Sequence, residues 1–88
     1  EIEYKIIEAP VEMKIGVSYD FIIESPNGDE LCYYFNNKPV KKVSKEGNSF
    51  KFSYSPEKKG QFYYAISNPD LYKDKSYPYS RISQYKIK

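Results

Sequence analysis

The stretch Ser49–Ser67, SFKFSYSPEKKGQFYYAIS, decides the fold. Its first six residues alternate polar with aromatic side chains, and its last seven place Phe62, Tyr64 and Ile66 on one face. Alternation with a period of two is typical of a β-strand that buries one face. Between these parts lie a proline, which has no amide proton for a sheet, and Gly60, which tolerates positive φ, so a connection between two strands is predicted there.

Similar alternation recurs along the rest of the chain and predicts about seven short strands. They cover residues 2–8, resumed at 11–15 after Ala9-Pro10 as one broken edge strand, then 17–24, 31–35, 40–44, 49–54, 61–67 and 79–87. In the last of them, Ile82 and Tyr85 are three residues apart, and a bulge near Ser83 is predicted to turn both inward. Residues 36–39 are predicted to form a turn. Short strands separated by turns at intervals of about 8–12 residues predict an all-β, immunoglobulin-like or fibronectin-III-like antiparallel sandwich.

The composition predicts one small domain, residues 1–88, with an aromatic core. A chain of this length buries only about 60–65% of its unfolded surface, so its core needs large side chains. Eleven tyrosines and five phenylalanines supply them. The rings predicted to define the core are Tyr19, Phe21, Tyr33, Phe35, Phe52, Tyr54, Phe62, Tyr64 and Tyr85. Nearer the start of the chain, the alternation predicts apolar faces made of Ile2, Tyr4, Ile6, Val11, Met13, Ile15 and Val17.

Few side chains are suited to catalysis or metal binding. Cys32 is the only cysteine, which excludes an intrachain disulfide and a Cys-based zinc site, and the chain has no histidine. Cys32 lies mid-strand, where an inert, partly buried thiol is expected. Calcium binding by Asp70 and Asp74 is conceivable, but no EF-hand-like loop accompanies them, so solvated turn residues are expected. The sequence predicts no enzyme activity, no cofactor and no metal site.

The net charge of +2 comes from interspersed lysines and acidic residues. Thirteen of the fourteen basic residues are lysines and the other is Arg81, whereas nucleic-acid binding normally needs basic side chains clustered on one face. The strongest clusters, Lys41-Lys42 and Lys58-Lys59, fall at predicted strand edges or loops, where lysines discourage aggregation. No apolar run is long enough to span a membrane. Neither nucleic acid nor direct membrane insertion is expected.

Residues 58–64, KKGQFYY, resemble the corner between strands E and F of immunoglobulin-like sandwiches. The usual pattern there has an acidic residue, a glycine, a tyrosine and a cysteine, and this chain has Lys58, Gly60, Phe62 and Tyr64. Phe62 has no hydroxyl for the backbone hydrogen bond of a tyrosine corner. The corner is therefore expected to depend on packing alone.

A closer resemblance covers nearly the whole chain. Residues 16–19 (GVSY), 31–35 (LCYYF), 50–56 (FKFSYSP) with Gly60, and 85–87 (YKI) resemble the bacterial triple-tyrosine-motif domain, in which such elements recur in this order. Members of that family are similar to immunoglobulin-like modules and occur, often in tandem, in secreted or surface proteins of clostridia and in two-component sensor regions. The resemblance implies a non-catalytic structural or accessory module, extracellular or at the cell surface, whose partners are neighbouring domains of a longer chain.

Two alternatives remain open. The segment Asn68–Tyr79 contains Tyr72, Tyr77 and Tyr79, and exposed tyrosines stack on sugar rings or anchor protein interfaces, which would make this loop a binding site for cell-wall glycan or another protein. Packing of Tyr77 or Tyr79 onto the core, with Pro78 stiffening the approach to the last strand, is favoured over binding. The other alternative is a dimerising or signal-transmitting module in a sensor ectodomain.

Overall fold

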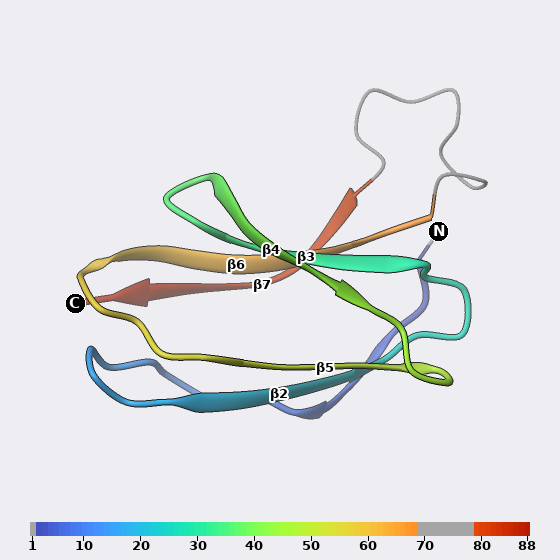
Figure 1. Ribbon diagram of the computed structural model, residues 1–88, viewed down its shortest axis with the longest axis horizontal. Coiled ribbons are helices and arrows are strands. Elements are labelled where there is room, and N and C mark those ends of the chain that lie inside the picture. Colours follow the sequence, from blue (N-terminus) through green and yellow to red (C-terminus); the bar gives the residue numbers. More distant parts are fainter. Residues whose placement is uncertain (1, 69–78) are drawn as a thin grey trace.

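The computed structural model describes residues 2–68 and 79–88, with backbone only for residues 79–81. These residues form two antiparallel sheets that pack face to face, with no helix among them (Figure 1). The strands are β1 (Lys5–Glu8), β2 (Tyr19–Glu24), β3 (Glu30–Phe35), β4 (Lys38–Ser44), β5 (Ser49–Tyr54), β6 (Gly60–Ser67) and β7 (Tyr79–Ile87). One sheet has the order β1-β2-β5 and the other has the order β4-β3-β6-β7. The prediction of an all-β antiparallel sandwich is confirmed.

The two strands of the deciding stretch lie in different sheets. β5 pairs with β2, whereas β6 pairs with β3 and β7, so the chain after Tyr54 crosses from one layer to the other. Their rings meet between the layers, where Phe62 stacks on Tyr54 with centroids 4.5 Å apart. Phe52 stacks in the same way on Tyr33 of the opposite sheet, at 4.8 Å. The faces predicted from the alternation are therefore the faces that form the interior.

Phe21 of β2 lies at the centre of this aromatic interior. It is fully buried and stacks on Phe52 at 4.6 Å, and its ring meets Tyr64 edge to face at 5.6 Å. Phe62 and Tyr85 complete its surroundings, at 5.7 and 6.1 Å. Aromatic pairs at such separations contribute about 0.5–1.5 kcal/mol each beyond the area they bury. All nine rings named from the sequence either belong to the buried core or pack against it.

The β3–β4 hairpin turns within two residues. Asn36 and Asn37 have φ values of 50° and 66°, the positive pair that a type I′ hairpin turn requires and that Asn adopts more readily than most residues. Because the loop is so short, β4 begins at Lys38 rather than Val40, and the prediction of a four-residue turn over 36–39 is wrong. Asn36 also fixes the hairpin to β6, since its side-chain Oδ1 accepts a hydrogen bond from the Gln61 amide at 2.9 Å.

The bulge predicted in the last strand is confirmed. The β6–β7 register shifts between Tyr64 and Ala65, which pair with Ser83 and Arg81, so Ile82 is the extra residue. Ile82 and Tyr85 both pack against the core despite their odd spacing. β7 is the edge strand of its sheet, a position where bulges are common.

The first part of the chain departs from the prediction. β1 covers only Lys5–Glu8, and all four of its residues are exposed. Of the apolar face predicted there, Ile2 is buried, whereas Tyr4 is 47% exposed and Ile6 is 43% exposed. These side chains are exposed because β1 is a short strand at the edge of its sheet, where its register with β2 shifts after Ile6. They therefore lie at the rim of the sandwich.

Residues 11–15 form no strand, contrary to the prediction of a resumed edge strand. Met13 alone is buried, while Val11 is 99% exposed and Ile15 is largely exposed as well. Val17, predicted to face inward, is exposed because β2 begins only at Tyr19. The Lys14 amide donates to the Tyr19 hydroxyl at 2.8 Å, so a side chain takes the hydrogen bond that a neighbouring strand would otherwise supply.

Candidate functional site

The residues proposed from the sequence to bind a partner lie largely outside the described residues. Tyr72 and Tyr77 fall in the gap between residues 68 and 79, as do Asp70 and Asp74. The backbone of Tyr79 pairs with Ser67 at the start of β7, and its side chain is outside the description. A binding site on this segment stays a prediction.

Two tyrosine hydroxyls in the described part of the chain donate hydrogen bonds that tie strands together. The Tyr85 hydroxyl donates to the Pro10 carbonyl at 2.9 Å, which fastens the last strand to the segment after β1. The Tyr64 hydroxyl donates to Ser83 Oγ at 3.2 Å, which links β6 to the bulged part of β7. Both hydroxyls are therefore used to hold strands together.

Burial extends the pH range over which these phenols stay protonated. It raises the pKa of Tyr85 to about 12, with a smaller contribution from nearby Tyr64. Burial also raises the pKa of Tyr64, Tyr33 and Tyr54, although the hydrogen bond from Tyr64 to Ser83 partly opposes the increase in the pKa of Tyr64. A phenol with a raised pKa is a poor nucleophile and a persistent hydrogen-bond donor, so the arrangement suits a structural role.

Cys32 lies in β3, on the side of the sheet away from the packed rings, yet it is only 1% exposed. Its thiol lies 3.8 Å from the Tyr33 carbonyl, a weak interaction with the adjacent backbone. Among residues 2–68 and 79–88, no group of three or more His, Cys, Asp or Glu side chains lies close enough to hold a metal ion. The same part of the chain contains no helix long and apolar enough to cross a membrane.

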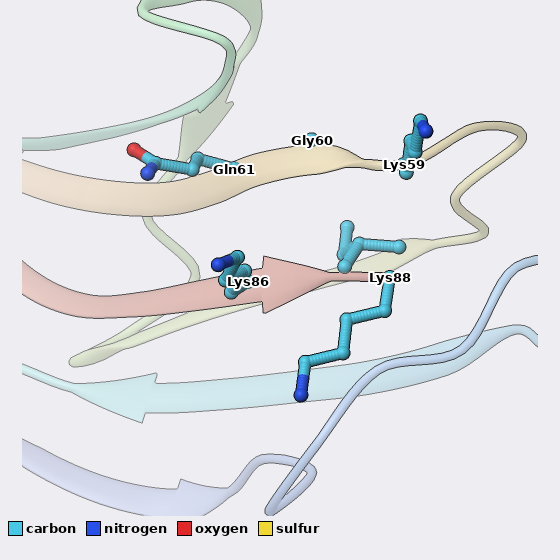
Figure 2. A pocket seen from close by; sticks show the side chains of 6 residues that line it. Lys59, Gly60, Gln61, Lys86 and Lys88 are labelled. Carbon is cyan, nitrogen blue, oxygen red and sulfur yellow. The ribbon is translucent and has the colours of Figure 1, made fainter.

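A hollow of about 570 Å³ lies at the end of the molecule where β6 begins and β7 ends. Its lining residues are Lys59, Gly60, Gln61, Lys86, Ile87 and Lys88. Figure 2 shows that the lysine side chains do not converge: Lys59 and Lys88 extend to opposite sides of the strands, and Lys86 lies further back on β7. An anion site needs donors that converge on one point, so this hollow is only a basic surface.

Two further hollows, of about 330 and 340 Å³, lie between β4 and β5 on one side of the sandwich. Both are bounded by these strands and reach inward to rings of β3. We refer to them together as the β4–β5 groove. Its lining residues are Tyr33, Lys41, Lys42, Val43, Ser44, Lys51, Phe52 and Ser53 in one hollow, and Phe35, Val40, Tyr54, Ser55, Glu57 and Lys58 in the other.

The β4–β5 groove combines an aromatic floor with a basic rim. Lys58 lies over the Phe35 ring, with its Nζ 5.8 Å from the ring centroid. Lys42 forms an exposed ion pair with Glu30 at 3.9 Å, and pairs of that kind contribute about 1 kcal/mol or less. Lys41 and Lys51 make no ion pair within the described part of the chain. The groove therefore carries positive charge that the described residues leave largely unneutralised.

The lysine clusters are visible in the sequence, whereas the groove is not. Lys41-Lys42 lies in an edge strand and Lys58-Lys59 in a connection, as expected for these pairs. Bringing Lys41 and Lys42 beside Lys51 requires the pairing of β4 with β3 and of β5 with β2, which no local pattern specifies. The alternation in residues 49–54, with its single outward lysine, was the available signal.

No protein-family model matches the chain, and no curated protein matches it in sequence. The function is therefore inferred from the arrangement of the residues themselves.

Proposed function

We propose that this domain is a non-catalytic structural module that spaces and orients the neighbouring domains of a longer protein. The observation that carries the proposal is the position of the two chain ends. The described chain begins toward one end of the longest axis and ends at the other, and that axis measures 37 Å (Figure 1). A chain that enters at one end and leaves at the other keeps the domains before and after it apart.

The ties at the ends of the fold support a spacer role. A spacer transmits orientation only if its first and last segments are fixed to the body between them. The hydrogen bond from Tyr85 to Pro10 joins residues 75 positions apart in the sequence, and it links the last strand to the segment that follows the first. Ile2 and Ile87, near the two ends, are both buried in the core.

Two resemblances support an assignment of the sandwich to the immunoglobulin-like class and of the domain to a bacterial parent protein. The pairings of β2 with β5 and of β3 with β6 are the crossed pairings of an immunoglobulin-like Greek key, which supports the assignment to that class. The aromatic pattern of residues 50–56 with Gly60 and the closing residues 85–87 resembles the triple-tyrosine-motif domain. On this basis the parent is a secreted or surface-exposed bacterial protein of several domains.

The test measures how rigidly the domain separates its neighbours. Two fluorescent proteins are fused to its ends, and the distance between them is measured by time-resolved energy transfer. We expect one narrow distance distribution, which broadens when urea unfolds the domain. The control replaces the domain by a flexible Gly/Ser linker of the same length, which behaves as a random coil and gives a broad distribution. An equally broad distribution for the folded domain would contradict the proposal.

A further inference from the structure

We propose that the β4–β5 groove binds an acidic peptide segment of another protein in extended conformation, which adds to the free edge of β5 as a further strand. This recognition mode combines backbone hydrogen bonds to an exposed sheet edge with pockets for alternate side chains. Three features of the described residues lead to it: the regularity of β5, the aromatic floor of the groove and the charge of its rim.

β5 is the more regular of the two edges that border the groove. Its six residues pair with β2 without any register shift, and no strand described in the structure pairs with its other side. β4 is a poorer template, because Pro39 lacks an amide proton and the β3–β4 register shifts between Tyr33 and Tyr34. The exposed edge of β5 extends over about 20 Å and would pair with a segment of about six residues.

The floor of the groove offers apolar contacts to alternate side chains of such a segment. A strand added beside β5 continues the sheet, so every second side chain points toward the interior, as Phe52 and Tyr54 do. At that position the groove exposes parts of Tyr33 and Val43 in one hollow and of Phe35 in the other. Small apolar side chains of the partner would lie against these three side chains.

The rim of the groove selects for acidic residues. Lys41 and Lys51 border one hollow without an ion-pair partner in the described part of the chain, and Lys42 has only a weak exposed one. Lys58 borders the other hollow, where Glu57 is the single acidic residue. Lysines on a free edge repel the same edge of a second copy and thereby discourage self-association. The same charges attract a strand that carries carboxylates.

The test uses a synthetic peptide of about six residues that alternates valine with glutamate. It is titrated into the isotopically labelled domain, and backbone amide signals are followed by NMR. We expect saturable shifts confined to residues 51–54 and 40–44. A peptide with methylated backbone nitrogens should not bind, because it cannot form the ladder. Shifts located elsewhere, or equal binding of the methylated peptide, would overturn the proposal.

Charge reversal provides the second part of the test. The double substitution Lys41→Glu with Lys51→Glu should weaken binding of the valine–glutamate peptide about tenfold or more. The same variant should bind a valine–lysine peptide, a gain that also shows it is folded. The matched control Lys86→Glu changes an exposed lysine of β7 outside the groove and should leave the affinity unchanged. An equal loss of affinity in both variants would count against an acidic peptide as the occupant. So would a change in the amide signals of β5 with protein concentration alone, because it would indicate a second copy of the domain at this edge.

Discussion

At the scale of single residues, the tyrosines of this domain combine a packed ring with a fixed hydroxyl. The ring of Tyr85 lies 6.1 Å from that of Phe21, while its hydroxyl reaches the carbonyl of Pro10. A phenylalanine at the same position would keep the first contact and lose the second. The two contributions can therefore be separated by one substitution.

We expect Tyr85→Phe to lower the free energy of unfolding by about 0.5–1.5 kcal/mol, the usual net contribution of one hydrogen bond. Urea unfolding followed by circular dichroism measures the difference. Tyr4→Phe is the matched control, because Tyr4 is about half exposed and its hydroxyl makes no hydrogen bond within the described part of the chain, so a change within about 0.5 kcal/mol is expected. Equal losses in the two variants would show that the hydroxyl of Tyr85 contributes no specific stability.

A second residue-scale prediction concerns Gly28. A Cβ at this position would clash with the Cγ2 atom of buried Ile66 and lie 2.7 Å from Ser25 Oγ. That oxygen cannot easily move, because it accepts a hydrogen bond from the Gly28 amide. The same Ser25 hydroxyl donates a hydrogen bond to the Glu3 carbonyl at 2.6 Å. Gly28→Ala should therefore cost about 1–3 kcal/mol through overpacking.

The control for Gly28 is Gly47, which has a φ of 62° and where an added Cβ would meet no atom of the described residues within 4 Å. Asn tolerates this backbone conformation, so Gly47→Asn should change stability by no more than about 0.5 kcal/mol. Thermal unfolding of both variants provides the comparison. If Gly28→Ala were as mild as Gly47→Asn, the turn over residues 25–29 would be more adaptable than its contacts indicate.

At the scale of secondary-structure elements, the β3–β4 hairpin depends on two consecutive residues with positive φ. Asn-Gly suits this turn better than Asn-Asn, because glycine has no Cβ to strain. Asn37→Gly should therefore raise the free energy of unfolding by a few tenths to about 1 kcal/mol. Asn37→Val should lower it by about 1–2 kcal/mol, since a β-branched residue strongly disfavours the left-handed region. Both are measured by urea unfolding, and effects of the same sign would contradict the assigned turn.

The elements that could be predicted from the sequence are those whose faces contact the opposite sheet. In β5 and β6 the inward rings of Phe52, Tyr54 and Phe62 meet rings of the opposite sheet, so burial follows the alternation directly. Residues 11–15 show the same alternation, but no strand described in the opposite sheet covers their apolar face. Val11 is therefore exposed, although its place in the alternation is that of a buried residue. Local periodicity reports which side chains share a face but not whether another element covers that face.

The candidate site was less predictable than the fold for a related reason. The β4–β5 groove joins Lys41 to Lys51 through the packing of two sheets, and each strand is paired only with a neighbour on its far side. Strand order therefore decides which lysines meet, and strand order could not be read from this sequence. The turn at Asn36-Asn37 was predicted too long, because its positive φ values depend on hairpin geometry, for which Asn-Asn is a weaker signal than Asn-Gly.

At the scale of the whole molecule, both sheets contribute phenols to one interior. Tyr33, Tyr64 and Tyr85 come from the four-stranded sheet and Tyr54 from the three-stranded sheet, and burial raises the pKa of each. A tyrosine in the unfolded chain loses its proton at about pH 10. Above that pH the unfolded chain therefore binds fewer protons than the folded domain, and rising pH favours unfolding.

The contribution of these tyrosines to stability should accordingly be complete below about pH 10 and should be lost as the pH rises through about 12, the pKa of Tyr85. Urea unfolding at several values between about pH 8 and about pH 12 tests this. Lysines also lose their charge in this range, so the informative quantity is the difference between the unmodified domain and Tyr85→Phe. Because the variant lacks the ionising phenol, its stability should fall less steeply, and the advantage of the unmodified domain should shrink with rising pH. Parallel curves would mean that the phenol of Tyr85 ionises equally readily in both states, and burial in a shared aromatic interior would then not govern its pKa.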